Sequence, residues 1–329
     1  MGDRSDIREN DIVAYDEALM PLLLVDRTRT VAGTVHNIMW ATDNYAQRGP
    51  GYGEWDEITV PAVTGENGLV LRPRVDKSRE EQERRSREKA EVFTPAWICN
   101  RQNNLVDAAW FGVGESPFNV ETAEAWTTKP GPVPFPTADG KTWQDYVTDT
   151  RLEMTCGEAP YLASRYDAIT GEDIPIPRRI GLLDRKLRVV GENVDDEKEW
   201  FKWAAEAYKS VYGFEWQGDN LVLAREALVC SFLDYYQEKF GRLPAKAHTR
   251  KIAEIVSWNL WQMDGLKGVI PGSCGDRVTT EFTLFGEIEH VEKCEGCEKE
   301  DMFKHNGIYC LIKDWGARKT IRFIDLLKK

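Results

Sequence analysis

The chain has 329 residues, of which 42% are hydrophobic and 30% charged, and its formal net charge is −12. This composition is typical of a globular protein with one large or two ordinary domains, and the acidic balance argues against a uniformly basic nucleic-acid coat. No apolar run approaches the roughly 18 residues that cross a bilayer, and the first residues lack the apolar core of a signal peptide. We therefore expect no membrane segment, a cytoplasmic location and, from seven unevenly scattered cysteines, no disulfide framework.

The first part of the chain, residues 1–72, contains short apolar runs interrupted by the glycine-rich stretch RGPGYGEWDE. It predicts a small N-terminal lobe with strands or irregular structure. The following segment, residues 72–89, has more Lys and Arg than Asp and Glu. Such a segment is typical either of a solvated, mixed-charge helix or of a basic arm that contacts phosphates.

A helix is predicted to begin in the stretch EVFTPAWICN. Thr94 has the side chain of an N-cap, and Pro95 suits the first helical position because its fixed φ angle and missing N–H cost nothing there. The prolines and glycines that follow in residues 114–142 exclude long helices and predict an ordered, loop-rich passage.

Residues 150–270 alternate short apolar stretches with long amphipathic ones, which favours an α/β unit with a parallel sheet. A glycine turn at Cys156 and Gly157 follows the first strand candidate, Glu215 ends the second, and Asp264 ends the third. A strand that turns through glycine into a helix offers backbone N–H groups to a ligand, and a strand-final acid can accept both ribose hydroxyls. The carboxylate of Asp264 could accept a hydrogen bond from an adenine amino group. Each feature alone also occurs in α/β proteins that bind nothing there.

In this order, the segments resemble the S-adenosylmethionine-dependent DNA adenine-N6 methyltransferases of restriction–modification systems. The family's helix start is similar to EVFTP here, its glycine turn to EMTCGEAPYL, its ribose-binding segment to YGFEWQGDNLVLAREAL, and its next strand to NLWQMDGL. The first position of the glycine turn is Glu rather than Asp, and its second glycine is missing. The resemblance, which covers about residues 75–270, implies that S-adenosylmethionine is bound by Phe93, Thr94, Pro95, Thr155, Cys156, Gly157, Glu158, Glu215 and Asp264.

The catalytic signature of that family, Asn/Asp/Ser-Pro-Pro-Tyr/Phe, does not occur in this chain. In the family it holds the flipped adenine by its amino group and stacks on the base. Three alternatives stay open: another subunit supplies this element, an unrecognised segment replaces it, or the protein only binds. Asp314 followed by Trp315 is the internal substitute that the sequence offers. Because residues 265–329 have room for only two further strands beside a metal module, we expect a partner polypeptide to dock near residues 255–329.

A metal site is predicted in the stretch KCEGCEKEDMFKHNGIYC. Cys294, Cys297, His305 and Cys310 supply two close pairs of soft ligands, as a closed tetrahedral zinc site requires, so the ion would be structural. The alternative is a set of free surface cysteines in a charged loop. Ser273 and Cys274 are candidate nucleophiles, but no residue that could act as their base lies near them in sequence. The sequence therefore assigns them no role.

The sequence therefore predicts an α/β protein with a Rossmann-like methyltransferase sheet, which would be incomplete, in residues 73–270. An N-terminal lobe (1–72) precedes it and a small zinc-binding module (271–329) follows it. The favoured function is a DNA adenine-N6 methyltransferase-like subunit with S-adenosylmethionine and structural zinc as cofactors, and with DNA and a second protein subunit as partners. The alternative is a catalytically silent DNA-binding or specificity subunit of a restriction or defence complex.

Overall fold

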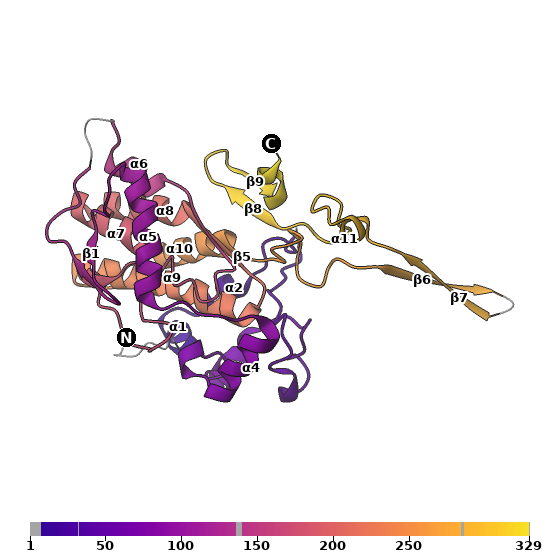
Figure 1. Ribbon diagram of the computed structural model, residues 1–329. Helices are drawn as coiled ribbons and strands as arrows, with labels where there is room; N and C mark the ends of the chain where they lie inside the picture. The colour runs from indigo at the N-terminus through magenta and orange to yellow at the C-terminus, as the bar shows by residue number, and fades with distance from the viewer. Residues whose placement is uncertain (1–7, 32, 136–139, 284–285, 329) are drawn as a thin grey trace.

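The computed structural model describes residues 8–31, 33–135, 140–283 and 286–328 (Figure 1). The α-helices are α1 (Glu9–Tyr15), α2 (Leu19–Leu24), α3 (Val60–Val63), α4 (Arg79–Lys89), α5 (Ala96–Phe111), α6 (Trp143–Thr148), α7 (Leu182–Asn193), α8 (Glu197–Lys209), α9 (Gly218–Phe240), α10 (Lys246–Asn259) and α11 (Glu295–Lys299). The strands are β1 (Asn119–Glu121), β2 (Trp126–Thr128), β3 (Arg151–Met154), β4 (Val211–Glu215), β5 (Leu260–Gln262), β6 (Arg277–Thr283), β7 (Gly286–Glu292), β8 (Leu311–Asp314) and β9 (Lys319–Arg322). No helix within these ranges is long and apolar enough to cross a membrane.

A parallel sheet of three strands organises the central region. Its order is β3-β4-β5, with Glu153 opposite Gly213 and Glu215 opposite Gln262. Parallel neighbours need crossover connections, and these carry α7 and α8 between β3 and β4, and α9 and α10 between β4 and β5. The mixed α/β class is thereby confirmed. The described residues add no fourth strand to this sheet, so a complete Rossmann-like sheet is not established.

The turn after β3 differs from the prediction of a strand that leads directly into a helix. Thr155, Gly157 and Ala159 all have positive φ angles, of 48°, 54° and 60°, and the next α-helix begins only at Leu182. Left-handed residues interrupt helical propagation, and Pro160 follows them. The backbone N–H groups of this turn therefore do not belong to the first turn of a helix.

Helix α9 is the centre of the hydrophobic core. Its sequence is apolar around most of its circumference, so it is buried along nearly its whole length. Of its buried charged residues, which also include Asp219 and Glu226, Arg225 binds the backbone of other elements. Its guanidinium donates to the backbone carbonyls of Leu23 at 2.6 Å, Val25 at 3.0 Å and Leu260 at 2.7 Å.

The N-terminal region packs into the same core. Leu19, Leu23 and Leu24 of α2 belong to the cluster that contains the buried residues of α9, and α2 also contacts α10. The boundary at residue 72 stays a prediction from sequence, while the packing joins both regions around one core.

The basic segment forms helix α4, which is docked on the body. Ser78 caps its N-terminus by accepting from the Glu81 N–H, and most of its charged side chains are exposed. Arg85 is the exception, with an exposed fraction of 0%. It forms ion pairs with Glu91 at 2.6 Å and Asp219 at 2.7 Å. The segment is therefore a helix with one buried anchor.

The C-terminal region contains two antiparallel strand pairs. β6 and β7 form a hairpin that extends away from the rest of the molecule, with α11 at its base (Figure 1). β8 and β9, both predicted from their apolar runs, pair with each other. Ile312 and Phe323 from this end pack with Phe214 and Trp261 in a second core cluster, which covers the β5 side of the sheet.

Candidate functional site

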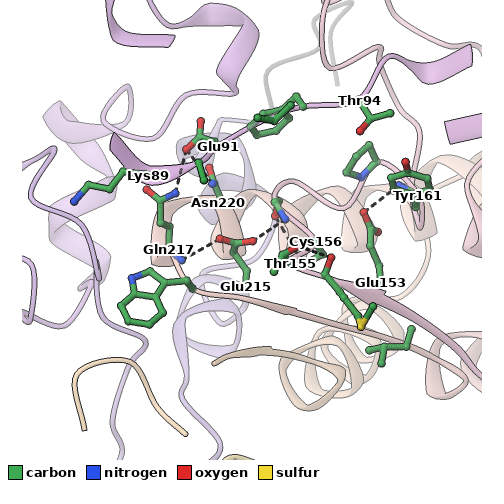
Figure 2. A pocket seen from close by; sticks show the side chains of 18 of the residues that line it. Lys89, Glu91, Thr94, Glu153, Thr155, Cys156, Tyr161, Glu215, Gln217 and Asn220 are labelled. Carbon is green, nitrogen blue, oxygen red and sulfur yellow. Dashed lines mark hydrogen bonds between the residues drawn. The ribbon is translucent and has the colours of Figure 1, made fainter. Parts of the chain in front are cut away.

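A cavity of about 1110 Å³ lies where β3 and β4 end (Figure 2). Residues before α5, the turn after β3, and the end of β4 form its walls. Its volume is at the upper end of the roughly 300–1,000 Å³ of ligand pockets. Ligands of open parallel sheets bind at this edge, so the cavity is the candidate functional site.

Six of the predicted cofactor residues line the cavity together: Phe93, Thr94, Thr155, Cys156, Gly157 and Glu215. The ring of Phe93 lies over the glycine turn, since a Cβ added at Gly157 would stand 3.7 Å from its edge atoms. The predicted helix start therefore does reach the predicted glycine turn, across 60 residues of sequence.

Three predicted residues do not line the cavity. Pro95 is the N-cap of α5, so the helix begins at Ala96 and not at Pro95, and Thr94 is not the N-cap as predicted. Glu158 turns away to accept the Arg74 N–H at 2.7 Å and the Tyr166 hydroxyl. Asp264 closes a turn of its own by accepting the N–H groups of residues 266 and 267 at 3.0 and 3.3 Å. The carboxylates of Glu158 and Asp264, which the sequence assigned to a ligand, are thus engaged in hydrogen bonds within the chain.

Glu215 is held by two backbone donors. Its carboxylate accepts the Gly157 N–H at 2.9 Å and the Gln217 N–H at 3.1 Å, one on each oxygen (Figure 2). Because each carboxylate oxygen has two lone pairs, each retains one for a ligand hydroxyl. Burial raises the pKa of Glu215 to about 7, against the opposing effect of the two N–H donors.

Glu153 is a second buried acid at the cavity that the residue prediction did not include. Its oxygens accept the N–H groups of Tyr161 at 3.3 Å and Leu162 at 3.1 Å. Burial raises its pKa to about 8, and the charge of Glu215 adds to the shift. The alternation of β3 could not have revealed it, because apolar Leu152 and Met154 lie on the exposed face of this strand and Glu153 lies on the buried one.

The rim beside Glu215 is built by Glu91, also missed by the residue prediction although it belongs to the EVFTP stretch. Its Oε2 accepts from Arg85 at 2.7 Å, from Gln217 at 3.2 Å and from Asn220 at 3.3 Å. Helix α4 therefore holds the rim through a buried charge network.

Acidic residues outnumber basic ones around the cavity, although the raised pKa values of Glu153 and Glu215 mean that these two acids retain protons near neutral pH. The ionisable residues lining it are Glu54, Arg87, Glu88, Lys89, Glu91, Glu153 and Glu215. Lys89 is paired with Asp43 at 3.0 Å. No helix follows the glycine turn directly, and the helix N-termini at the cavity are those of α5 and α9, where Thr94 and Gln217 line it.

A second candidate site lies in the C-terminal region. Cys274, Cys294, Cys297 and His305 bring their ligand atoms within 4.8 Å of one another. The Cys274 Sγ lies 3.4 Å from that of Cys294, 3.5 Å from that of Cys297 and 3.3 Å from the His305 Nδ1. A tetrahedral zinc ion separates such ligands by roughly 3.5–3.8 Å, given bonds of about 2.3 Å to sulfur and 2.0 Å to nitrogen. The cluster can therefore hold a metal ion such as zinc.

Cys310 was predicted as the fourth ligand, and this is corrected to Cys274. The Cys310 thiol donates to the Gln262 carbonyl at 3.3 Å inside the second core cluster. Cys274 precedes β6 and Cys294 follows β7, so the hairpin brings both to its base. Sequence spacing could not reveal this, because Cys274 and Cys294 are 20 positions apart and become neighbours only when the strands pair.

Local structure supports the metal cluster. Cys294 is the N-cap of α11 and Cys297 lies within that helix, which makes a tight turn around the ligands. The Cys294 Sγ accepts the Asn306 N–H at 3.4 Å, and the His305 N–H donates to the Tyr309 hydroxyl at 2.8 Å. These contacts orient the ligands as outer-shell partners do in metal sites.

Comparison with known proteins identifies no relative: no family model matches the chain, and no match was found among curated proteins or solved structures.

Cys274→Ser is expected to lower bound zinc from about one ion per chain to near zero, because three remaining ligands cannot close a structural site. Cys310→Ala is the matched control and should keep its zinc while losing some core packing. Elemental analysis of both purified variants measures this directly. Full zinc content in the Cys274 variant would contradict the assignment.

The free energy of unfolding should fall as pH rises from about 5 to 8. In the unfolded chain Glu153 and Glu215 ionise near their ordinary pKa, whereas in the folded chain their pKa values are raised to about 8 and about 7. Each glutamate contributes its full share to the free energy of unfolding below the pKa that it has in the unfolded chain. Above that pKa the contribution falls by up to about 1.4 kcal/mol per pH unit for each group. Urea unfolding at several pH values measures the slope. Glu153→Gln should make it shallower, and an unchanged slope would contradict the assignment.

Proposed function

We propose that the chain binds S-adenosylmethionine in this cavity, as a DNA adenine-N6 methyltransferase-like subunit. The arrangement of Glu215 carries the proposal: a strand-final carboxylate is fixed by the Gly157 and Gln217 N–H groups and keeps one free lone pair on each oxygen. Two acceptors in that geometry suit the two hydroxyls of a ribose. Phe93 closes over the same turn.

The electrostatics support this ligand over other adenosine cofactors. A dinucleotide or a nucleoside triphosphate brings negative phosphates, for which the lining supplies only Arg87 and Lys89 as cations, and Lys89 is already paired with Asp43. S-adenosylmethionine instead carries a positive sulfonium and no phosphate. An acidic cavity without a helix N-terminus on its glycine turn is therefore consistent with this cofactor.

The internal substitute for the missing catalytic signature does not reach the cavity. Asp314 accepts the Ala317 N–H at 2.8 Å within a turn, and the Trp315 ring N–H donates to Asn259 at 2.8 Å. Neither lines the cavity. This favours a partner as the source of the base-binding element.

The sequence indicated that this partner docks near residues 255–329. We propose instead that it docks at β3. The β5 side of the sheet packs against the chain's own Ile312 and Phe323. β3 is the other edge strand, and its Leu152 and Met154 are 42% and 69% exposed while lining the cavity. Parallel sheets are normally covered, so a partner at this edge would complete both the sheet and the cavity.

DNA contact is proposed for the exposed face of α4. Arg79, Arg84 and Arg87 are exposed on this helix, and Arg87 also lines the cavity. Arginine side chains beside a cofactor cavity can position a phosphate backbone without reading its sequence.

The alternative is a DNA-binding or specificity subunit without catalysis. The distance of Asp314 and Trp315 from the cavity favours it, since the chain itself then offers no base-holding group. Binding of S-adenosylmethionine separates the alternatives, because a silent scaffold has no need of the cofactor.

Glu215→Ala is expected to weaken S-adenosylmethionine binding by on the order of 2 kcal/mol, or about thirtyfold, through loss of two charge-assisted hydrogen bonds. Isothermal titration calorimetry measures it. Glu238→Ala changes the same residue type at the far end of α9 and should bind normally. Equal affinity of the Glu215 variant and wild type would remove the proposed ribose contact.

The isolated chain should transfer no methyl group to DNA, because it lacks the base-holding signature. The assay incubates the purified protein with labelled S-adenosylmethionine and mixed-sequence duplex DNA, with a complete adenine-N6 methyltransferase as positive control. Clear adenine-N6 product from the chain alone would refute the need for a partner.

A further inference from the structure

The base end of the proposed cofactor needs a contact other than Asp264. That carboxylate closes the turn at residues 264–268 and does not line the cavity. The cavity continues past Glu215 to Trp216, where a segment of the N-terminal region forms the wall.

This N-terminal segment is anchored to the sheet by several hydrogen bonds. Gln262 of β5 binds both the N–H and the carbonyl of Met39, at 2.9 and 2.8 Å. The Ala41 carbonyl accepts the Trp216 ring N–H at 3.0 Å, and the Ala41 N–H donates to the Glu54 carbonyl at 2.7 Å. Ala41 therefore links Trp216 directly to Glu54.

Two side chains at this wall are available to a ligand. Trp216 is 37% exposed, lines the cavity and has its ring fixed by the bond to Ala41. Glu54 also lines the cavity and is half-buried, and its carboxylate has no hydrogen bond or ion pair within the described residues. An aromatic face beside an acceptor-only group suits a planar base that carries an amino group.

We propose that Trp216 and Glu54 form the adenine subsite, with the base against the Trp216 ring and its 6-amino group donating to the Glu54 carboxylate. This inference rests on the proposed cofactor. It gives the N-terminal region a role in recognition. Because a carboxylate accepts but does not donate, it binds the 6-amino group but repels an oxygen in that position, so a 6-oxo base must shift to offer its N1–H and binds more weakly.

The experiment compares S-adenosylhomocysteine with its inosine counterpart, in which an oxygen replaces the 6-amino group. Isothermal titration calorimetry on the full chain should show that the adenine compound binds at least tenfold more tightly. Glu54→Ala should weaken binding of the adenine compound about tenfold and bring the two affinities within threefold of each other. Glu66→Ala, an exposed glutamate of the same region, is the matched control and should keep the wild-type ratio.

The outcomes separate this inference from the proposed function. If wild type binds both compounds with equal affinity, the adenine subsite is wrong while the cofactor site stands. If it binds neither these compounds nor S-adenosylmethionine, both proposals fall. The ratio of the two affinities in the wild type does not depend on the folding of a variant. Glu54→Gln gives a second test. Because an amide can both donate and accept, it can bind either base and should lower this ratio. A Glu54→Gln ratio equal to that of wild type would overturn the role of Glu54.

Discussion

The buried guanidinium of Arg225 holds the parts of this molecule in register. Within the described residues it forms no ion pair, and it donates to the backbone carbonyls of Leu23, Val25 and Leu260. Burial lowers its pKa to about 9, which reflects the cost of placing a cation in the core. Those carbonyls belong to the end of α2 and the start of β5, so one side chain of α9 sets the N-terminal region against the sheet. The cavity wall at Ala41 and Glu54 depends on that placement.

The candidate site is built from acids whose burial is offset mainly by backbone N–H groups. Glu153 and Glu215 each accept two such bonds, and Glu91 shares the Arg85 guanidinium with Asp219. Perturbed acids in a cavity are typical of functional sites, because their desolvation is tolerated where a ligand supplies the missing partner. A ligand that donates hydrogen bonds to these carboxyl groups would supply such a partner.

The C-terminal region uses a different means of stabilisation. A two-stranded hairpin is marginal on its own, and β6 and β7 project from the body with Val278 and Phe282 exposed at 56% and 76%. The Cys3His cluster lies at the hairpin base and includes a residue from each side of it. A bound metal ion would stabilise the base of this hairpin, while the residues after it pack in the second core cluster.

The sequence by itself was enough to predict the features that depend on near neighbours. The mixed α/β class, the strands at 211–215 and 311–314, the helix after Pro95 and three of the four metal ligands follow from local patterns of apolar, glycine and cysteine residues. Gly157 and Glu215 share one cavity because residues at the ends of parallel strands meet at one edge. Tertiary structure decided what depends on distant pairing. The hairpin put Cys274 rather than Cys310 in the metal cluster, and a local turn used Asp264. The buried contacts of the N-terminal region brought Glu54 to the cavity. The spacing of residues along the chain does not predict this contact between distant segments.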